Sequence, residues 1–598
     1  TLAVELASPT AADIENAQRG GLLVVAGDEN VDAPAYAVEP QRTSGLSGSG
    51  VDGWRITILD TGSRMDVLNA LAFTRAVFLR TPRSSVGRAS AMVDLPGLSV
   101  SVSAFVDSVD DAVLAVADGA TDLLLRDWDT ERLGELRDAL EGHELVERTV
   151  FPPGLDYDTV VAALDAGALS GYLNQVDGSG CARPRVEWAP GKDMSIPKPD
   201  TRVSTAWADD GWLDGRRGTV ADASPPLRGI LERALAGERP SRDEVEALFR
   251  ARGIDVEAIA SAADEVRART VGDDVTFVVN RNINYTNQCY FKCGFCAFSK
   301  GPRSLDLRGE PYLMSIDEVA QRSVEAWERG ATEVCLQGGI HPDFTGQFYI
   351  DVVEAVKAAV PEMHVHGFTP LEIWQGAETA GTSVRDLLER LKAAGLGTLP
   401  GTAAEILDDD VRLTLCPDKI RTSQWVEVML TAHDIGLRTT STMMFGHVDG
   451  PRSWANHLEV LRNVQMRTGG FTEFVPLPFV HMGAPLWLRG KARPGPTWDE
   501  VILVHAVSRL AFMGLIDNIQ ASWVKLGLDG AEALLRAGCN DVGGTLMDES
   551  ISRAAGASHG TEATSADFLD LILDLDRQPV RRNTVYEPIE SGLQIIQP

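Results

Sequence analysis

Short apolar runs recur at regular spacing through the second half of the chain, separated by longer segments with helical periodicity. The runs are rich in β-branched residues, which is typical of strands buried in a parallel sheet. We predict strands at residues 275–283, 333–337, 363–368, 397–400, 438–444, 471–476, 518–523 and 541–545. Eight strand–helix repeats in roughly 270 residues predict a parallel α/β barrel of the TIM type. Functional residues of such barrels lie at the carboxyl ends of the strands, where we expect the motifs described below.

The first 180 residues carry a shorter alternation of strand and helix patterns, with a period of roughly 25 residues that indicates parallel α/β structure, either a separate α/β domain or a decayed barrel. Strands are predicted at 21–25, 54–59, 98–106, 122–126 and 145–151, and helices at 65–75, 109–117, 131–140 and 158–169. No catalytic motif is present in this region, and its function is left unassigned.

The two alternating regions are separated by residues 181–224, which are rich in Pro, Asp and Gly and predict a linker. Helical patterns follow at 227–236, 242–252 and 256–269, the second opening with a capping box of Ser241 and Glu244. The predicted organisation is therefore an α/β region at 1–180, a linker at 181–224, a helical lead-in at 225–272, and a barrel with a C-terminal extension at 273–598.

The charge of the chain limits its partners. A net charge of −31 and a pI of about 4.7 repel nucleic acids and anionic membranes. No apolar run approaches the roughly 20 residues of a membrane helix, and no secretory leader is recognisable. We therefore expect a cytoplasmic protein without a nucleic-acid or membrane partner. Seven cysteines in 598 residues are too few for a disulfide scaffold.

Three of these cysteines lie within eight positions. Cys289, Cys293 and Cys296 form a C-x3-C-x2-C pattern directly after the first predicted barrel strand. A 4Fe-4S cluster normally takes four thiolates. With three, one iron stays open for a chelating amino-acid ligand such as the methionine part of S-adenosylmethionine (SAM). The alternative is a zinc site completed by a distant fourth ligand, because structural zinc is four-coordinate.

Further sequence blocks accompany the cysteines. They are VNRNIN at 279–284, LQGG at 336–339, HVH at 364–366, PLEI at 370–373, PGTAAE at 400–405, STMMFGH at 441–447, FVPL at 474–477, SWVKLG at 522–527 and NDVGGT at 540–545. Together with the cysteine pattern, they resemble the CofH family of radical SAM enzymes, the tyrosine-using half of FO synthase. The resemblance covers about residues 225–590.

The resemblance implies a reaction and its partners. A reduced 4Fe-4S cluster would cleave SAM, and the resulting radical would take a hydrogen from L-tyrosine. The 4-hydroxybenzyl fragment would then be joined to 5-amino-6-(D-ribitylamino)uracil, on the route to the deazaflavin chromophore FO. Ring closure belongs to CofG, which carries its own cysteine triplet in fused FO synthases. Because residues 1–272 contain only Cys181, the resemblance implies a separate CofG-type protein, besides an electron donor.

The resemblance also implies a set of site residues. Cys289, Cys293 and Cys296 would hold the cluster; His364, His366 and Glu372 would be catalytic; and Phe295, Gly338, Gly339, Glu405, Met444 and Gly446 would bind SAM. His364 and His366 share one face of their strand, since side chains alternate. Weaker candidates for substrate contact are Asn284, Gln337, His447, Glu473, Lys525 and Trp523. Structural roles remain open for the single residues: a turn at the glycines, an ion pair at Glu405, and core packing at Met444.

Two other functions stay open from the sequence. One is a related radical SAM enzyme of menaquinone biosynthesis, such as aminofutalosine synthase, which acts on a chorismate-derived enol ether. The other is a zinc-stabilised barrel that acts as a scaffold without catalysis.

Overall fold

The computed structural model describes residues 218–299 and 310–589 continuously. Of residues 1–217 it describes the strands named below and residues 107–118, 120, 135–136, 138–140, 157, 160–161, 164, 166–181, 183 and 188–197. The chain divides into two compact units. One comprises residues 1–185, 200–208 and 489–493, and the other residues 186–199, 209–488 and 494–598.

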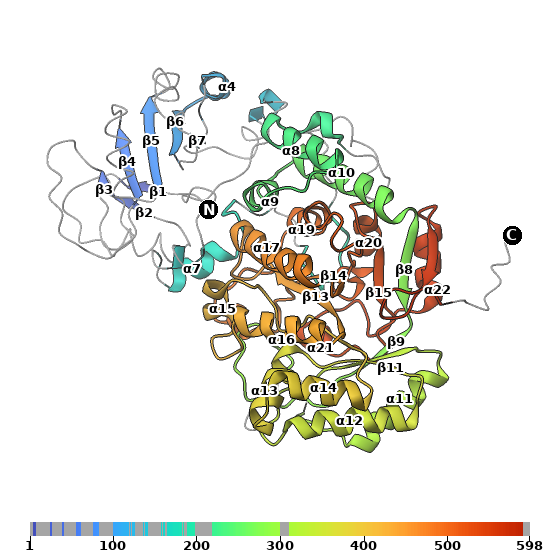
Figure 1. The fold of residues 1–598 in the computed structure, drawn as a ribbon. Helices are drawn as coiled ribbons and strands as arrows, with labels where there is room; N and C mark the ends of the chain where they lie inside the picture. The colour runs from blue at the N-terminus through green and yellow to red at the C-terminus, as the bar shows by residue number, and fades with distance from the viewer. Residues whose placement is uncertain are drawn as a thin grey trace. The chain divides into compact units, whose positions relative to one another are not determined.

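The second unit is built around parallel strands (Figure 1). Six of them form one sheet in the order β14-β13-β12-β11-β10-β9. Their bounds are β9 (Asn280–Ile283), β10 (Glu333–Leu336), β11 (His364–Gly367), β12 (Thr398–Leu399), β13 (Arg438–Phe445) and β14 (Phe471–Pro478). A further sheet has the order β15-β8-β16, with β8 (Asp274–Val278), β15 (Asp541–Gly544) and β16 (Gln578–Arg581).

Isolated parallel bridges join these two sheets into a ring. Phe474 of β14 pairs with Ile519, and Gln520 pairs with Asp541 of β15. The ring closes where Met547, after β15, pairs with Arg281 of β9. The predicted parallel barrel is therefore confirmed. The prediction of a full strand at 518–523 was wrong, because only two bridging residues remain and Trp523 already begins helix α20 (Trp523–Leu535), its indole donating to Gly544 O at 3.0 Å.

Helices follow the strands as the periodicity predicts, and their starts are set by side-chain caps. Ser315 accepts a hydrogen bond from Glu318 N at 3.1 Å at the start of α11, and Ser241 and Glu244 form the predicted capping box of α9. Besides α20, the helices of this unit are α8 (Pro225–Leu235), α9 (Arg242–Phe249), α10 (Ile254–Val271), α11 (Ile316–Glu328), α12 (Gly346–Ala359), α13 (Pro370–Ala380), α14 (Val384–Ala394), α15 (Asp409–Leu415), α16 (Thr422–Asp434), α17 (Pro451–Thr468), α18 (Pro485–Leu488), α19 (Trp498–Ala511), α21 (Ile551–Ala555) and α22 (Ser565–Leu573). None of the described helices is both long and apolar enough to cross a membrane.

The first unit contains a five-stranded parallel sheet in the order β3-β4-β5-β6-β7 and a separate β1–β2 pair. The bounds are β1 (Val4–Leu6), β2 (Val24–Ala26), β3 (Glu39–Pro40), β4 (Ile56–Asp60), β5 (Ala76–Pro82), β6 (Val100–Val106) and β7 (Asp122–Leu125), with helices α4 (Val109–Ala117) and α7 (Ala166–Leu173). The predictions at 98–106, 109–117 and 122–126 are confirmed, whereas β5 was missed. The predictions at 65–75 and 145–151 lie outside the described residues.

Buried histidines should make this fold acid-sensitive. Burial lowers the pKa of His366, His433 and His505 to about 4, and that of His457 to about 3. Unfolded histidine titrates near pH 6.5, so between about pH 6.5 and 4 the unfolded chain binds more protons than the folded chain. The stability of the folded protein therefore decreases as the pH is lowered. Burial raises the pKa of Glu473 to about 7 and also raises the pKa of Glu372, so these two carboxyl groups oppose the trend set by the four histidines.

We therefore expect the free energy of unfolding to fall steadily from about pH 6.5 to 4.5, on the order of 2 kcal/mol per histidine at the lower end. The urea midpoint should fall with it. Urea titrations at several pH values, followed by circular dichroism, would measure it. A midpoint that stays level or rises over this range would contradict the prediction.

Candidate active site

The loop that carries the three cysteines leaves the carboxyl end of β9 and is anchored on both sides. Gly294 N donates to Leu415 O at 2.8 Å, and Gly294 O accepts from Leu486 N at 2.7 Å. Lys292 N donates to Asp418 Oδ2 at 2.8 Å. These contacts hold the loop between α18 and the end of α15 with the turn that follows it, so long-range contacts determine the position of the loop.

The three thiols are partly exposed, and Cys296 interacts electrostatically with both Cys289 and Cys293. Burial raises the pKa of Cys293, and the neighbouring Cys296 raises it further while Lys419 lowers it. Burial also raises the pKa of Cys296, with a contribution from Cys289. Within the described part of the chain, no three His, Cys, Asp or Glu side chains form a group that could hold a single metal ion.

Gly338 and Gly339 follow β10 and let its end approach the cysteine loop. A Cβ at Gly339 would lie 2.2 Å from Gln288 O and 3.0 Å from Cys289 Cβ. A Cβ at Gly338 would lie 2.3 Å from the ring of Tyr285. Contacts this short cannot be accommodated by any side chain without moving backbone, so both positions require glycine.

Glu405 forms a buried ion pair with Lys419 beside the cysteine loop. Although burial favours the neutral acid, Lys419 holds the pKa of Glu405 below its ordinary value. The Lys419 ammonium also lies 5.2 Å from the ring centre of Phe295. The ion pair left open by the sequence is therefore present, and Lys419 places a positive charge next to the cysteine thiols. Sequence reasoning missed Lys419, since a lone lysine in a turn has neither periodicity nor motif spacing.

Met444 and Gly446 end β13 as predicted. Met444 N donates to Glu405 O at 2.9 Å, so the ends of neighbouring strands are joined at this point. Gly446 has a φ of 99°, and a Cβ there would lie 2.2 Å from Pro496. Both carboxylate oxygens of Asp449 accept from Gly446 N at 3.0 Å. The conformation of this loop is thus fixed by a glycine and a buried acid.

Glu372 is fully buried, and its contacts are structural. It belongs to the capping box of α13 with Thr369, and it accepts hydrogen bonds from Tyr285 OH and from Gly338 N, the latter at 3.1 Å. Burial raises its pKa. The structure therefore places Glu372 behind the glycines, where it ties β10, α13 and the start of the cysteine loop together, and gives it different partners from the two histidines.

His364 and His366 both contact the hydroxyl of Thr398 on β12. His364 Nε2 lies 2.8 Å and His366 Nδ1 2.7 Å from Thr398 Oγ1. The two rings therefore share a face, as the alternation predicts. His364 is the first residue of β11 and lies at the amino end of the strand, as the predicted strand at 363–368 also implies. His366 lies further along, towards the carboxyl end where functional residues are expected.

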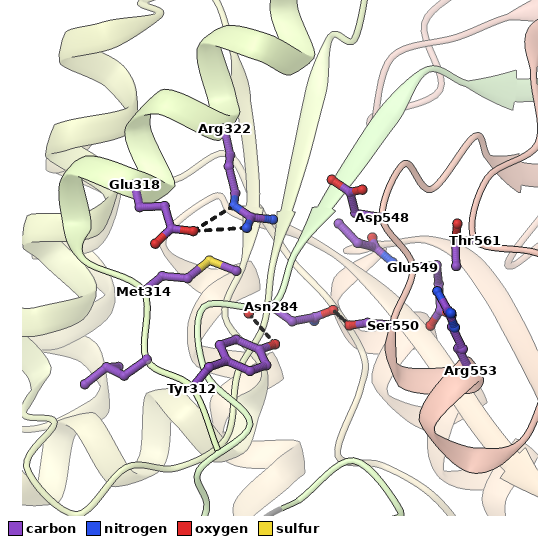
Figure 2. Close-up of a pocket in the computed structure, with 12 residues that line it drawn as sticks. Asn284, Tyr312, Met314, Glu318, Arg322, Asp548, Glu549, Ser550, Arg553 and Thr561 are labelled. Carbon is purple, nitrogen blue, oxygen red and sulfur yellow. Dashed lines mark hydrogen bonds and ion pairs between the residues drawn. The ribbon is translucent and has the colours of Figure 1, made fainter. Parts of the chain in front are cut away.

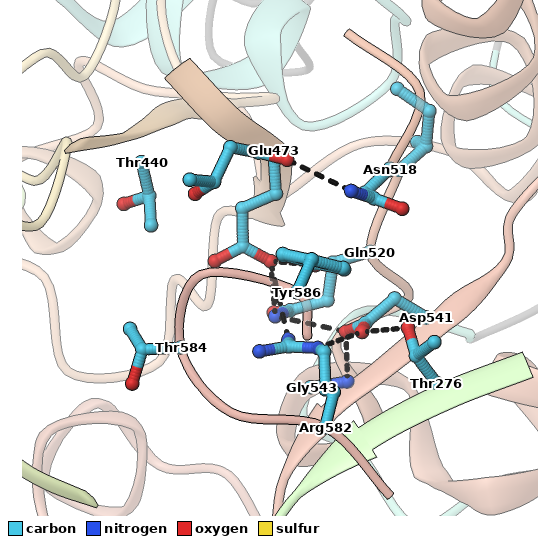
Figure 3. A network of polar contacts seen from close by, with 12 residues as sticks. Thr276, Thr440, Glu473, Asn518, Gln520, Asp541, Gly543, Arg582, Thr584 and Tyr586 are labelled. Atoms are coloured by element: carbon cyan, nitrogen blue, oxygen red, sulfur yellow. Dashed lines mark hydrogen bonds and ion pairs between the residues drawn. The ribbon is translucent and has the colours of Figure 1, made fainter. Parts of the chain in front are cut away.

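A buried polar network, which we call the barrel floor, occupies this amino end (Figure 3). Arg582 donates to Asp541 at 2.7 Å and lies 3.5 Å from Glu473 Oε2. Its guanidinium stacks at 3.9 Å on the ring of Tyr586. Thr584 donates to Glu333 on β10. The floor comprises Glu333, Glu473, Asp541, Arg582, Thr584 and Tyr586, and the last three come from the segment after β16.

The remaining candidates lie either in the wall of the barrel or at its rim, by which we mean the carboxyl ends of the strands. Asn284 Nδ2 donates to Gln337 O at 3.2 Å at the rim. His447 is fully buried, and its Nε2 lies 2.9 Å from Met444 O. Lys525 Nζ donates to Ser552 Oγ at 2.8 Å. Trp523 packs in the core.

The residues at the rim fit an iron–sulfur cluster with a bound cosubstrate. Three adjacent, partly exposed thiols are available on one loop, and the glycine cradle at Gly339 keeps a side chain away from Cys289. The Lys419 charge favours the deprotonated thiolates that metal binding needs. We consider this donor set suited to a cluster held by three cysteines.

Two family models match the part of the chain that forms the barrel. The family model of the radical SAM superfamily matches residues 283–461, and that of the CofH/MqnC C-terminal region matches residues 468–595. Among solved structures, methylornithine synthase (PylB) is 18% identical with a TM-score of 0.47, and covers 59% of this chain and 97% of its own.

Curated relatives are much more similar in sequence. FO synthase of Mycobacterium leprae is 54% identical over 61% of this chain, but the match spans 43% of that protein, so the chain covers less than half the length of such relatives. The 5-amino-6-(D-ribitylamino)uracil–L-tyrosine 4-hydroxyphenyl transferase of Methanothermobacter thermautotrophicus is 47% identical over 60% of this chain and 97% of that protein. With a relative matched over nearly its whole length and three thiols gathered at the rim of a parallel barrel, the chain belongs to the CofH family of the radical SAM superfamily.

Proposed function

We propose that this protein joins the 4-hydroxybenzyl group of L-tyrosine to 5-amino-6-(D-ribitylamino)uracil in the biosynthesis of FO. The observation that carries the proposal is that the three thiols lie on the loop at the carboxyl end of β9, whereas the barrel floor lies at the amino end of the strands. The similarity to the Methanothermobacter transferase over 97% of its length supports the same reaction.

Cys289, Cys293 and Cys296 would hold three irons of a 4Fe-4S cluster, leaving the fourth for SAM. When bound, this pair supplies the 5′-deoxyadenosyl radical that takes a hydrogen atom from L-tyrosine. The cradle at Gly338 and Gly339 would admit the methionine part of SAM. Phe295, Glu405, Met444 and Gly446 would surround the nucleoside part.

Inside the barrel, His366 is the residue we propose to contact the substrate. Burial lowers its pKa to about 4, so the ring is neutral near pH 7 and can donate from one nitrogen while accepting at the other. Thr398 fixes the ring orientation through Nδ1. His364 would serve as a positioning residue that holds Thr398 from the amino end of β11.

Completion of FO would require a CofG-type protein for ring closure and a separate electron donor. Residues 1–272 contain Cys181 as their only cysteine, so they offer no second cluster triplet. The parallel α/β region at the start of the chain is given no part in the reaction.

The function is tested by anaerobic incubation of the reconstituted protein with SAM, a reductant, L-tyrosine and the diaminouracil. We expect 5′-deoxyadenosine and the coupled product only when L-tyrosine is present. Turnover of a chorismate-derived enol ether instead would assign the protein to the menaquinone enzymes. A colourless protein that binds zinc and no iron would exclude the radical reaction.

His366→Asn should lower kcat/KM by about 10- to 100-fold, because a hydrogen bond to the reacting substrate is lost. His364→Asn changes the other partner of Thr398 and serves as the matched control, with an expected loss of about threefold or less. Both variants should retain the iron content of the unaltered protein. Equal losses in the two variants would contradict a substrate contact at His366.

A further inference from the structure

A polar cavity of about 450 Å³ opens between β9 and the segment that follows β15 (Figure 2). Among the described residues, backbone pairing between these segments ends at Asn282 and Met547. Beyond that point the gap is bridged by a side-chain contact, with Ser550 Oγ donating to Asn284 Oδ1 at 2.9 Å. The volume lies within the usual range of small-molecule sites.

The carboxylates of this cavity are already neutralised or bonded. Glu318 pairs with Arg322 at 3.0 Å. Asp548 pairs with Arg281 at 2.5 Å, and Glu549 accepts from Ser552 N at 2.9 Å. Each of these carboxylates therefore already has an ion-pair or hydrogen-bond partner.

Its free polar groups suit a hydroxylated chain. The side chains of Asn282, Arg553 and Thr561 line the cavity and have no hydrogen-bond partner in the described part of the chain. An amide, a guanidinium and a hydroxyl together provide donors and acceptors spread along one wall. A row of hydroxyl groups, each of which both donates and accepts, can satisfy all of them.

The cavity also shares a wall with the cysteine loop. Tyr312 N donates to Asn287 Oδ1 at 2.9 Å, and Tyr312 OH donates to Asn284 O at 2.8 Å. The ring centres of Tyr312 and Phe298 lie 6.5 Å apart, and Phe298 is two residues after Cys296 in the chain. A ligand in the cavity would thus lie next to the loop that carries the cluster cysteines.

Asn282 connects the cavity to the barrel interior. It lies between Asn280 and Asn284 on alternate positions of β9, and Asn280 Nδ2 reaches across to Glu333 of the barrel floor at 2.8 Å. Because alternate residues of a strand share a face, Asn282 faces the interior as well as the cavity. A molecule lying here can place one end in the interior and the other at the rim.

We propose that this cavity binds the ribityl chain of the diaminouracil substrate, with the uracil ring in the barrel interior. The proposal rests on the proposed function and names the subsite that recognises the polyol. An amino-acid zwitterion would be the competing occupant. It is disfavoured because every carboxylate that could bind its ammonium group already has a partner.

The test uses Arg553→Met and Thr561→Val in the full-length, cluster-loaded protein. Each variant is assayed with 5-amino-6-(D-ribitylamino)uracil and with 5,6-diaminouracil, which lacks the ribityl chain. Arg467→Met is the matched control, since Arg467 and Arg553 are both exposed arginines in the last turn of a helix. Calorimetric binding of the ribityl compound to each protein gives a readout that does not depend on turnover.

We expect Arg553→Met and Thr561→Val each to weaken binding and kcat/KM for the ribityl compound by about tenfold. The values for 5,6-diaminouracil, the KM for L-tyrosine and all values of Arg467→Met should stay unchanged. Equal losses with both uracils, a rise in the KM for L-tyrosine, or no change would each overturn the proposal. If the unaltered protein binds the ribityl compound but forms no tyrosine-dependent product, the proposed function fails while the subsite stands.

Discussion

Cys293→Ala should reduce tyrosine-dependent 5′-deoxyadenosine formation by at least about a thousandfold, because two thiolates do not retain a 4Fe-4S cluster. Cys293 interacts electrostatically with both Lys419 and Cys296, so it belongs to the donor set of the cysteine loop. The variant should remain folded, since the loop is held by backbone contacts of Gly294 with Leu415 and Leu486. Iron and sulfide analysis, together with the visible absorption of the reconstituted protein, would measure the loss of the cluster.

Cys416→Ala is the decisive control for this experiment. Cys416 is buried and lies near enough to Cys293 to influence its pKa, although it is 120 residues away from the cysteine triplet along the chain. A cluster with an open iron does not need it, and the variant should keep its iron and its activity. Loss of the metal from Cys416→Ala would instead indicate a closed site of four thiolates, as in structural zinc proteins, and the radical reaction would be excluded.

The fold could be predicted from the sequence because its signals are local. Apolar residues mark strands such as β13 and β14, and caps such as Ser241 and Ser315 mark the helix starts. The prediction failed at Ile519 and Gln520, where the chain makes two bridges and then turns into α20. Strand propensity does not distinguish such a short bridge from a strand, since the bridge forms by pairing with Phe474 on one side and Asp541 on the other.

The candidate site was predictable only where it is contiguous in sequence. The cysteine triplet and the glycines after β10 are adjacent residues with a recognisable spacing. Lys419 and Thr398 come from separate strand–helix units and meet the site only in the folded chain. The hydrogen bond that Glu372 accepts comes from Tyr285, which lies 87 residues earlier in the chain. Contacts of this kind leave no spacing in the sequence.

Arg582→Met should destabilise the barrel by about 3–5 kcal/mol, because it leaves a buried carboxylate without its partner. Arg582 is 3% exposed and donates to Asp541, which is fully buried. Although burial favours the neutral form, Asp541 raises the pKa of Arg582 above its ordinary value. The substitution also removes the stacking of the guanidinium on Tyr586. Urea or thermal unfolding near pH 7 would measure the loss of stability.

Two companion variants separate this explanation from a general effect on β16. Arg581→Met changes the preceding residue, whose guanidinium donates to Gly330 O outside the barrel floor, and should cost about 1 kcal/mol or less. The double variant Arg582→Met with Asp541→Asn removes the stranded charge as well, so it should recover part of the stability lost by Arg582→Met alone. If the losses of Arg582→Met and Asp541→Asn simply add in the double variant, the charge pair does not hold the barrel floor together. In that case the segment after β16 would stabilise the barrel through its packing, and the carboxylates of the barrel floor would be free to serve the substrate.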